Sequence, residues 1–304
     1  RRWRRWWALC KVLSMPHRKD PVWLDAQYDA RARVPQHMEI IERWAKASAL
    51  VRSAAPAVLD LRYGDGDGAT LDLFPATAGT APAAGAPVLV FIHGGWWRAL
   101  DKSDFSFLAA SFAAHGVLLV VPNYALCPKA SIEQQALQMT QAVAWVRANA
   151  AAHGGDASRL AVVGHSAGGH LAAMLLSCRW KEVAPDLPAQ PLAGALAISG
   201  LFDLEPLRHV RWLQPDLRLT PASVARLSPA FFPRPKAGKL YAVAGLEESE
   251  EFLRQNRLIR DVWGPTTVPV CETLPGMHHF NVLESLADPA GRLHELALRL
   301  VDLR

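Results

Sequence analysis

The sequence is poor in cysteine and has no long apolar run. Four cysteines occur among 304 residues and form neither a Cys-x-x-Cys pair nor a cluster with histidine; they are Cys10, Cys127, Cys178 and Cys271. This pattern argues against a zinc site and favours buried thiols in a reduced, cytoplasmic setting. No apolar segment approaches the ~20 residues that a helix requires to cross a bilayer, so we expect no membrane span.

The chain also lacks an excess of charge once its first residues are set aside. Residues 1–19 contain seven of the 33 basic residues and no acidic residue, so the other 26 basic residues face 28 acidic ones. The run Arg1-Arg2-Trp3-Arg4-Arg5-Trp6-Trp7 has a composition suited to anionic membranes or nucleic acid. We nevertheless expect residues 1–19 to be a disordered or poorly packed extension, with Met15 an alternative start, and we predict no nucleic-acid partner. Lys11 interrupts the apolar stretch that a signal peptide would require.

Residues 160–176 predict a strand, a tight turn and a helix with a serine at the turn. Leu160-Ala161-Val162-Val163 is an apolar run of the length of a strand buried on both faces. In Gly164-His165-Ser166-Ala167-Gly168, glycines flank the serine at positions where a side chain would clash in a sharp strand-to-helix turn. The pattern predicts that Ser166 occupies a strained elbow at a helix N-terminus, whose amides favour negative charge.

A second loop with two glycines follows the apolar strand expected at Val88–Ile92. Its sequence is His93-Gly94-Gly95-Trp96-Trp97, and the glycines let backbone amides point into a site without obstruction. In enzymes built on the serine elbow, the amide after the serine and amides of this loop hold the oxyanion. We therefore expect Gly94, Gly95 and Ala167 to form an oxyanion hole.

Strand-like and helix-like segments alternate along the rest of the chain. Further strands are expected at 58–63 and 71–74 as a hairpin, and at 117–121, 192–198, 240–244 and 268–273; helices are expected at 22–51 with a break at Pro35, and at 105–114, 131–151 and 281–303. This alternation predicts an α/β fold with a mainly parallel sheet and helices on both faces. Ligands then bind at the carboxyl ends of the strands. We expect one domain over residues 20–304, with a small irregular cap at 201–236 that selects the substrate.

A serine nucleophile requires a base, and the base requires an acid that fixes its tautomer. The chain order expected for this architecture is nucleophile, acid and histidine. His278 and His279 follow the last expected strand, at the edge of the sheet that faces the elbow. Several carboxylates follow the strands before it, namely Asp203, Glu247, Glu248 and Glu250.

Four motifs resemble the α/β-hydrolase family of arylformamidases, also called kynurenine formamidases. They are His93-Gly94-Gly95-x-Trp97, the elbow at 164–168, "EESEEFLRQ" followed by "HHF", and Gln27-Tyr28-Asp29-Ala30-Arg31. The resemblance extends from about Trp23 onward. It implies an α/β-hydrolase fold with Ser166 as nucleophile, Glu248 as acid and His279 as base. The family usually has aspartate at the acid position, so the extra methylene of Glu248 requires a local shift.

The resemblance also implies the activity. Arylformamidases are serine hydrolases that convert N-formyl-L-kynurenine to L-kynurenine and formate in tryptophan degradation, and the acyl-enzyme mechanism requires neither metal nor organic cofactor. We expect Trp96, Trp97 and Tyr124 to stack on an aromatic leaving group and Tyr28 to reach over the pocket. A general carboxylesterase of the same fold is the alternative, because the motifs do not separate amides from esters. The intact motifs disfavour a non-enzymatic binding protein, and the sequence leaves a homodimer open.

Overall fold

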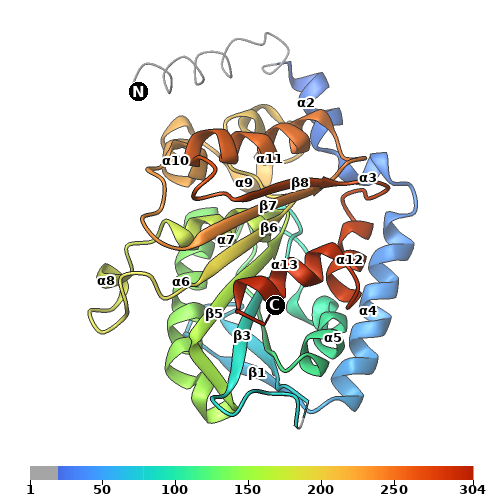
Figure 1. Ribbon diagram of the computed structural model, residues 1–304. Coiled ribbons are helices and arrows are strands. Elements are labelled where there is room, and N and C mark those ends of the chain that lie inside the picture. The colour runs from blue at the N-terminus through green and yellow to red at the C-terminus, as the bar shows by residue number, and fades with distance from the viewer. Residues whose placement is uncertain (1–19, 78, 304) are drawn as a thin grey trace.

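An eight-stranded sheet organises the computed structural model, which describes residues 20–77 and 79–303. The strands lie in the order β1-β2-β4-β3-β5-β6-β7-β8, and all pairs from β4 to β8 along this order are parallel (Figure 1). Their bounds are Val58–Arg62 (β1), Thr70–Phe74 (β2), Ala86–Ile92 (β3), Leu118–Pro122 (β4), Gly155–His165 (β5), Gly194–Ile198 (β6), Lys239–Gly245 (β7) and Val270–Leu274 (β8). The mainly parallel sheet is confirmed, whereas the expectations for residues 1–19 lie outside the described residues.

The first two strands form the predicted hairpin. β1 pairs antiparallel with β2, which also pairs antiparallel with β4. Asp72 on β2 is fully buried, and it accepts hydrogen bonds from Lys102 Nζ at 2.7 Å and from Arg52. A buried carboxylate is stable only when paired, so these cations explain how an acidic residue occupies a core strand.

Helices cover both faces of the sheet, as the alternating segments predict (Figure 1). The α-helices are α2 (Pro21–Tyr28), α3 (Ala30–Arg33), α4 (His37–Ala54), α5 (Ala109–Ala114), α6 (Ile132–Asn149), α7 (Ala167–Leu176), α8 (Trp180–Val183), α9 (Gln214–Leu217), α10 (Pro221–Leu227), α11 (Glu250–Trp263), α12 (Glu284–Ala287) and α13 (Arg292–Leu300). α6 and α7 lie on one face, and α5 and α13 lie on the other. None of the helices in the described ranges is both long and apolar enough to cross a membrane.

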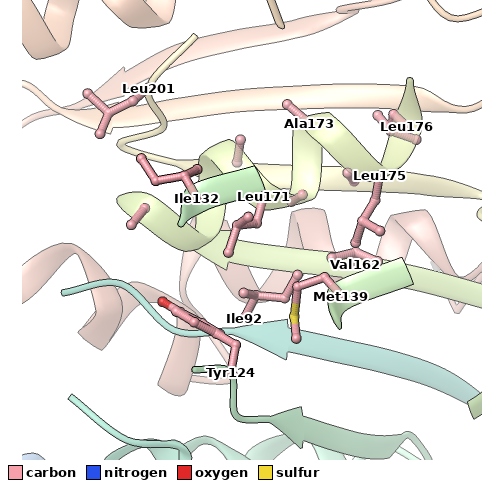
Figure 2. Close-up of a cluster of buried hydrophobic side chains, with 14 of the residues drawn as sticks. Ile92, Tyr124, Ile132, Met139, Val162, Leu171, Ala173, Leu175, Leu176 and Leu201 are labelled. Carbon is pink, nitrogen blue, oxygen red and sulfur yellow. The ribbon is translucent and has the colours of Figure 1, made fainter. Parts of the chain in front are cut away.

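Side chains of β3 alternate between two hydrophobic cores. Val90 and Ile92 belong to the core under α6 and α7, while Leu89 and Phe91 belong to the core under α5 and α13. Figure 2 shows Ile92 close to side chains of the first core. Because β3 is buried on both faces, its sequence is a continuous apolar run rather than an alternating one.

The segment expected as one helix at 105–114 has two parts. A 3-10 helix, η2 (Lys102–Leu108), precedes α5. Asp101 caps η2, because its side chain accepts a hydrogen bond from Ser103 N while Asp104 reaches back to the Asp101 amide. This reciprocal cap starts the helical region earlier than the apolar pattern indicates.

The N-terminal arm, residues 21–54, contains one helix break in addition to the break expected at Pro35. Asp29 ends α2 and caps α3, since its Oδ1 accepts a hydrogen bond from Ala32 N at 2.9 Å. The Tyr28 hydroxyl donates to Glu251 Oε2 at 2.7 Å, which ties α2 to α11. The arm therefore packs on the part of the fold that follows β7.

Residues 201–236 form short helices with irregular connections. Besides α9 and α10 they contain the 3-10 helices η4 (Pro206–His209) and η5 (Pro229–Phe231). The remaining 3-10 helices of the described residues are η3 (Ala150–His153) and η6 (Asn281–Leu283). The η4 and α9 region packs beside α2, because Arg211 N and Nε both donate to the Asp25 carboxylate.

Candidate active site

Ser166 lies at the turn between β5 and α7 in a positive-φ conformation that is rare for residues other than glycine, with φ of 56° and ψ of −117°. A Cβ on Gly164 would lie 2.1 Å from the Gly168 carbonyl oxygen, and a Cβ on Gly168 would lie 2.0 Å from that of Ile92. Both distances are far below van der Waals contact, so the elbow requires both glycines. The backbone carries the strain that the motif predicts.

Ser166, His279 and Glu248 meet at the carboxyl edge of the sheet. The Nε2 atom of His279 lies 3.1 Å from Ser166 Oγ, and its Nδ1 lies 2.7 Å from Glu248 Oε2. The three residues are 2%, 7% and 6% exposed. The carboxylate accepts a hydrogen bond from Nδ1–H, which leaves Nε2 unprotonated and able to accept a proton from the serine. In this arrangement the Ser166 hydroxyl can act as a nucleophile, the His279 imidazole as its base and the Glu248 carboxylate as the acid that orients the imidazole.

The Glu248 carboxylate is held from three directions. Besides His279, its Oε1 atom accepts hydrogen bonds from Ser199 Oγ at 2.5 Å and from Gly245 N at 2.8 Å. Ser199 follows β6, and sequence reasoning missed it. Its position directly after a strand next to the β7 loop is the signal that would have indicated it.

The other acid candidates lie elsewhere. Glu247 and Glu250 are exposed. Asp203 is buried, but its Oδ2 atom pairs with Arg254 Nη1 at 3.2 Å. Burial raises the pKa of Asp203, a change that the Arg254 charge opposes. Of the four carboxylates considered from the sequence, the structure brings Glu248 to the imidazole.

His278 has a structural position in the same loop. Its Nδ1 atom accepts hydrogen bonds from the amides of Phe280 and Asn281, each at 3.2 Å. Its own amide donates to Asn281 Oδ1 at 2.6 Å. The ring of His278 therefore closes the turn that presents His279 to Ser166.

The 93–97 loop lies directly against the elbow. A Cβ on Gly94 would lie 3.0 Å from Ser166 Cβ. The His93 carbonyl accepts a hydrogen bond from the Tyr124 hydroxyl at 2.9 Å, and the Gly94 carbonyl lies 2.8 Å from His93 Nδ1. Because N–H and C=O of a trans peptide point in opposite directions, the amides of Gly94 and Gly95 face away from these partners. Ala167 begins α7 immediately after Ser166.

The imidazole of His93 supports this loop from below. It stacks between Phe105 and Tyr124, with ring centroids 5.7 Å and 4.4 Å away. Its Nε2 atom lies 3.1 Å from Asn123 Oδ1. Burial lowers the pKa of His93, so the ring is neutral near pH 7.

A small cavity of about 30 Å3 opens beside Ser166. Its walls come from α3, α4, the 93–97 loop with the residues that follow it, the serine elbow and the loop after β8. The lining residues are Ala30, Arg31, Ile41, Trp44, Gly95, Trp96, Leu100, His165, Ser166, His279 and Phe280. A larger depression of about 750 Å3, which we call the vestibule, adjoins it. The cavity and the vestibule share Arg31, Gly95 and Trp96 as lining residues.

Of the four aromatic residues expected at the substrate, Trp96 lines both hollows. The structure does not bring the other three to these hollows but buries them in the core. Tyr28 and Trp97 are fully buried, and the Tyr124 ring lies under the 93–97 loop with its hydroxyl on the His93 carbonyl. Burial raises the pKa of Tyr124, so its hydroxyl stays protonated and donates the hydrogen bond to the His93 carbonyl. Trp212, which was not predicted, lines the vestibule edge-on to Trp96 at 5.6 Å.

His165 is a second residue that sequence reasoning missed. Its Nε2 atom lies 2.8 Å from the His279 carbonyl oxygen, and the two rings are 4.8 Å apart. Burial, together with the neighbouring His279, lowers the pKa of His165 well below its usual value. The neutral ring donates Nε2–H to the carbonyl and so fixes the backbone of His279.

In the part of the chain that the structure describes, no group of three or more His, Cys, Asp or Glu side chains is placed to hold a metal ion. The groups gathered at the elbow are a hydroxyl, an imidazole, a carboxylate and backbone amides. Together they suit acyl transfer to water.

Comparison with known proteins finds formamidases and esterases of similar sequence and fold. The BD-FAE family model matches residues 71–183, which include both the 93–97 loop and the elbow. Kynurenine formamidase from Salmo salar is 29% identical over 261 residues, covering 82% of this chain and 84% of the relative. Esterase LipQ from Mycobacterium tuberculosis is 28% identical over 75% of this chain and 58% of the esterase. The solved structure of a candidate thioesterase from Silicibacter superposes with a TM-score of 0.78 and 32% sequence identity, and the match covers 90% of this chain and 98% of the thioesterase chain.

The chain thus belongs to the α/β-hydrolase family and is a hydrolase. Within that family, its resemblance to the kynurenine formamidases is confirmed at 28–29% identity to relatives from two fishes and from Drosophila melanogaster.

Proposed function

We propose that this hydrolase is an arylformamidase whose substrate is N-formyl-L-kynurenine, which it converts to L-kynurenine and formate. The cavity beside Ser166 is the observation that carries the proposal. Its volume of about 30 Å3 is only a small multiple of the ~10–15 Å3 that one water requires. A formyl group has two heavy atoms and fits this space, whereas a longer acyl chain would have to displace the walls.

The leaving group would occupy the vestibule. Trp96 and Trp212 line it and offer aromatic surface to an aryl ring. An arylformamide therefore matches both hollows, with its small acyl group at Ser166 and its ring outside.

In the proposed mechanism, Ser166 is the nucleophile, His279 the general base and Glu248 the acid that stabilises the imidazolium. The serine oxygen attacks the formyl carbon while His279 Nε2 takes the hydroxyl proton. Amides of Gly94, Gly95 and Ala167 receive the negative charge on the formyl oxygen. One such donor typically lowers the barrier by ~3 kcal/mol.

The imidazolium of His279 then gives its proton to the leaving arylamine nitrogen as the C–N bond breaks. A formyl ester of Ser166 remains. Water loses a proton to His279 and attacks this ester, and the proton returns to Ser166 as formate leaves. Every step uses water and groups of this chain.

The second candidate is a general carboxylesterase, which the similarity to esterase LipQ favours. Comparing kcat/KM for N-formylkynurenine with kcat/KM for p-nitrophenyl acetate and butyrate separates the two. We expect the formamide to be preferred, and the N-acetyl analogue to be cleaved at least about tenfold more slowly than the N-formyl compound after correction for intrinsic reactivity. A preference for the esters by orders of magnitude would overturn the formamidase proposal.

We propose a reducing, cytoplasmic setting for this reaction and a small-molecule substrate. Cys127, Cys178 and Cys271 are free thiols, which supports a reducing compartment. A homodimer stays a prediction, and sedimentation equilibrium of the full chain tests it.

A further inference from the structure

Arg31 is a cation in the wall that the cavity and the vestibule share. Its side chain is exposed, and within residues 20–77 and 79–303 it forms no ion pair. A guanidinium offers five N–H donors in a fixed planar fork that fits a carboxylate. The chain thus presents an unused carboxylate-binding group next to the route between solvent and Ser166.

The other guanidinium of the vestibule is already occupied. Arg98 pairs with Asp216, and its guanidinium carbon lies 5.3 Å from the centroid of the Trp212 ring. Asp29, the second acidic residue of the vestibule, caps α3 through Ala32 N. The two arginines and two aspartates balance in charge, so the vestibule does not attract polyanions in general. A ligand with a single carboxylate suits it better.

Long-range contacts hold the arm that carries Arg31. On α2, the Asp25 carboxylate accepts hydrogen bonds of 2.8 Å and 2.6 Å from Arg211, and Tyr28 donates to Glu251. Ala30, next to Arg31, is buried and lines the cavity. The backbone at Arg31 is therefore fixed relative to Ser166, as recognition of a bound substrate requires.

We infer that Arg31 binds the carboxylate of an amino-acid leaving group, so that the enzyme selects formamides of aromatic amino acids over neutral formanilides and neutral esters. This inference rests on the proposed function for its acyl group, but it concerns the other end of the substrate. Arg31 is a binding residue in this account, and the chemical step at Ser166 does not involve it.

The test compares substrates with and without the carboxylate. Arg31→Gln is expected to lower kcat/KM for N-formylkynurenine by about 10- to 100-fold, mainly through KM, because a hydrogen-bonded ion pair is lost. For the decarboxylated analogue, N-formylkynuramine, the same variant should lower kcat/KM by less than about threefold. Arg31→Lys should restore part of the loss, since it keeps the charge but not the bidentate fork.

Arg33 provides the matched control. It lies on the same short helix, is also exposed, and lines neither the cavity nor the vestibule. It lines one hollow with Glu247 and His278 and a second, of about 10 Å3, behind Glu248 and His279. Arg33→Gln removes the same charge from the arm and should change neither substrate by more than about twofold. An equal loss in both arginine variants would indicate a general effect of charge and would overturn the inference. An equal loss on both substrates in Arg31→Gln would overturn it as well.

Failure of the proposed function is distinguishable from failure of this inference. If formamides are not cleaved, the same variants are assayed on 4-acetoxybenzoate and phenyl acetate, which differ in a carboxylate on the leaving group. A loss confined to 4-acetoxybenzoate in Arg31→Gln would support the binding role of Arg31 although the formamidase proposal had failed. Normal formamide cleavage without any Arg31 dependence would contradict the role of Arg31 alone.

Discussion

Ser199 donates a 2.5 Å hydrogen bond to Oε1 of Glu248, while Oε2 of the same carboxylate accepts one from His279. Ser199 has a φ of 52°, and its amide donates to the Val243 carbonyl on the neighbouring strand at 2.7 Å. The serine is thus fixed by the pairing of β6 with β7. Its hydroxyl holds a glutamate at the position where the resembling family usually has aspartate.

Removing this anchor should slow the chemical step. We expect Ser199→Ala to lower kcat by about tenfold with KM within about twofold, because Glu248 then orients the imidazole less well. Steady-state kinetics on the best substrate measures both constants. Glu247→Gln, at an exposed neighbour of Glu248, is the control and should keep the wild-type kcat. Wild-type kcat in Ser199→Ala would show that the contact has no role in positioning.

The buried His170 predicts how stability depends on pH. Burial lowers its pKa to about 4, while Nε2 lies 2.7 Å from the Leu227 carbonyl oxygen. Below its unfolded pKa of ~6.5, the unfolded chain binds a proton that the folded chain excludes. The contribution of His170 to stability is therefore complete above about pH 6.5 and declines as the pH falls toward 4.

Urea unfolding near pH 7.5 and near pH 5 measures this effect. In going to the lower pH, wild-type protein should lose about 2 kcal/mol more stability than His170→Gln, which keeps an N–H donor but cannot titrate. Equal pH dependence of the two proteins would show that His170 takes up a proton in the folded state.

The buried ion cluster around Arg254 should dominate the stability of the arm and α11. Arg254 donates two 2.8 Å hydrogen bonds to Glu251 and one of 3.2 Å to Asp203. Arg254→Met removes the cation that pairs with both buried carboxylates, and we expect it to destabilise the protein by about 3–5 kcal/mol. Arg292→Met, which breaks pairs of similar length at a site one-third exposed, should cost about 1 kcal/mol or less. Equal changes in urea midpoint would contradict this distinction.

Much of the fold and the central part of the site could be predicted from the sequence because their signals are local. The glycine spacing of the elbow can be recognised within five residues: Gly164 closely approaches Gly168 in the same turn, although Gly168 in turn lies against Ile92 of the neighbouring β3. Val88–Ile92 is a continuous apolar run because both faces are buried. The two loops therefore follow from short stretches of sequence. The same holds for the hairpin of β1 and β2.

The rest depends on contacts between distant segments. Ser199 reaches Glu248 because β6 lies beside β7, and His165 reaches the His279 carbonyl across the edge of the sheet. Whether an aromatic ring faces the cavity or the core depends on the packing around it, so Trp97 and Tyr124 could not be told apart from Trp96 by sequence. Arg31 reaches the vestibule because its arm packs on residues 211 and 251.

The central claim is that Ser166, activated by His279, carries the acyl group. The most direct measurement is mass spectrometry of the protein after reaction with a fluorophosphonate, with Ser166→Ala in parallel. We predict one label per chain on the peptide that contains Ser166, and in the folded variant no label and at least about a 1,000-fold loss of kcat. A label on another residue, or substantial turnover by folded Ser166→Ala, would contradict it.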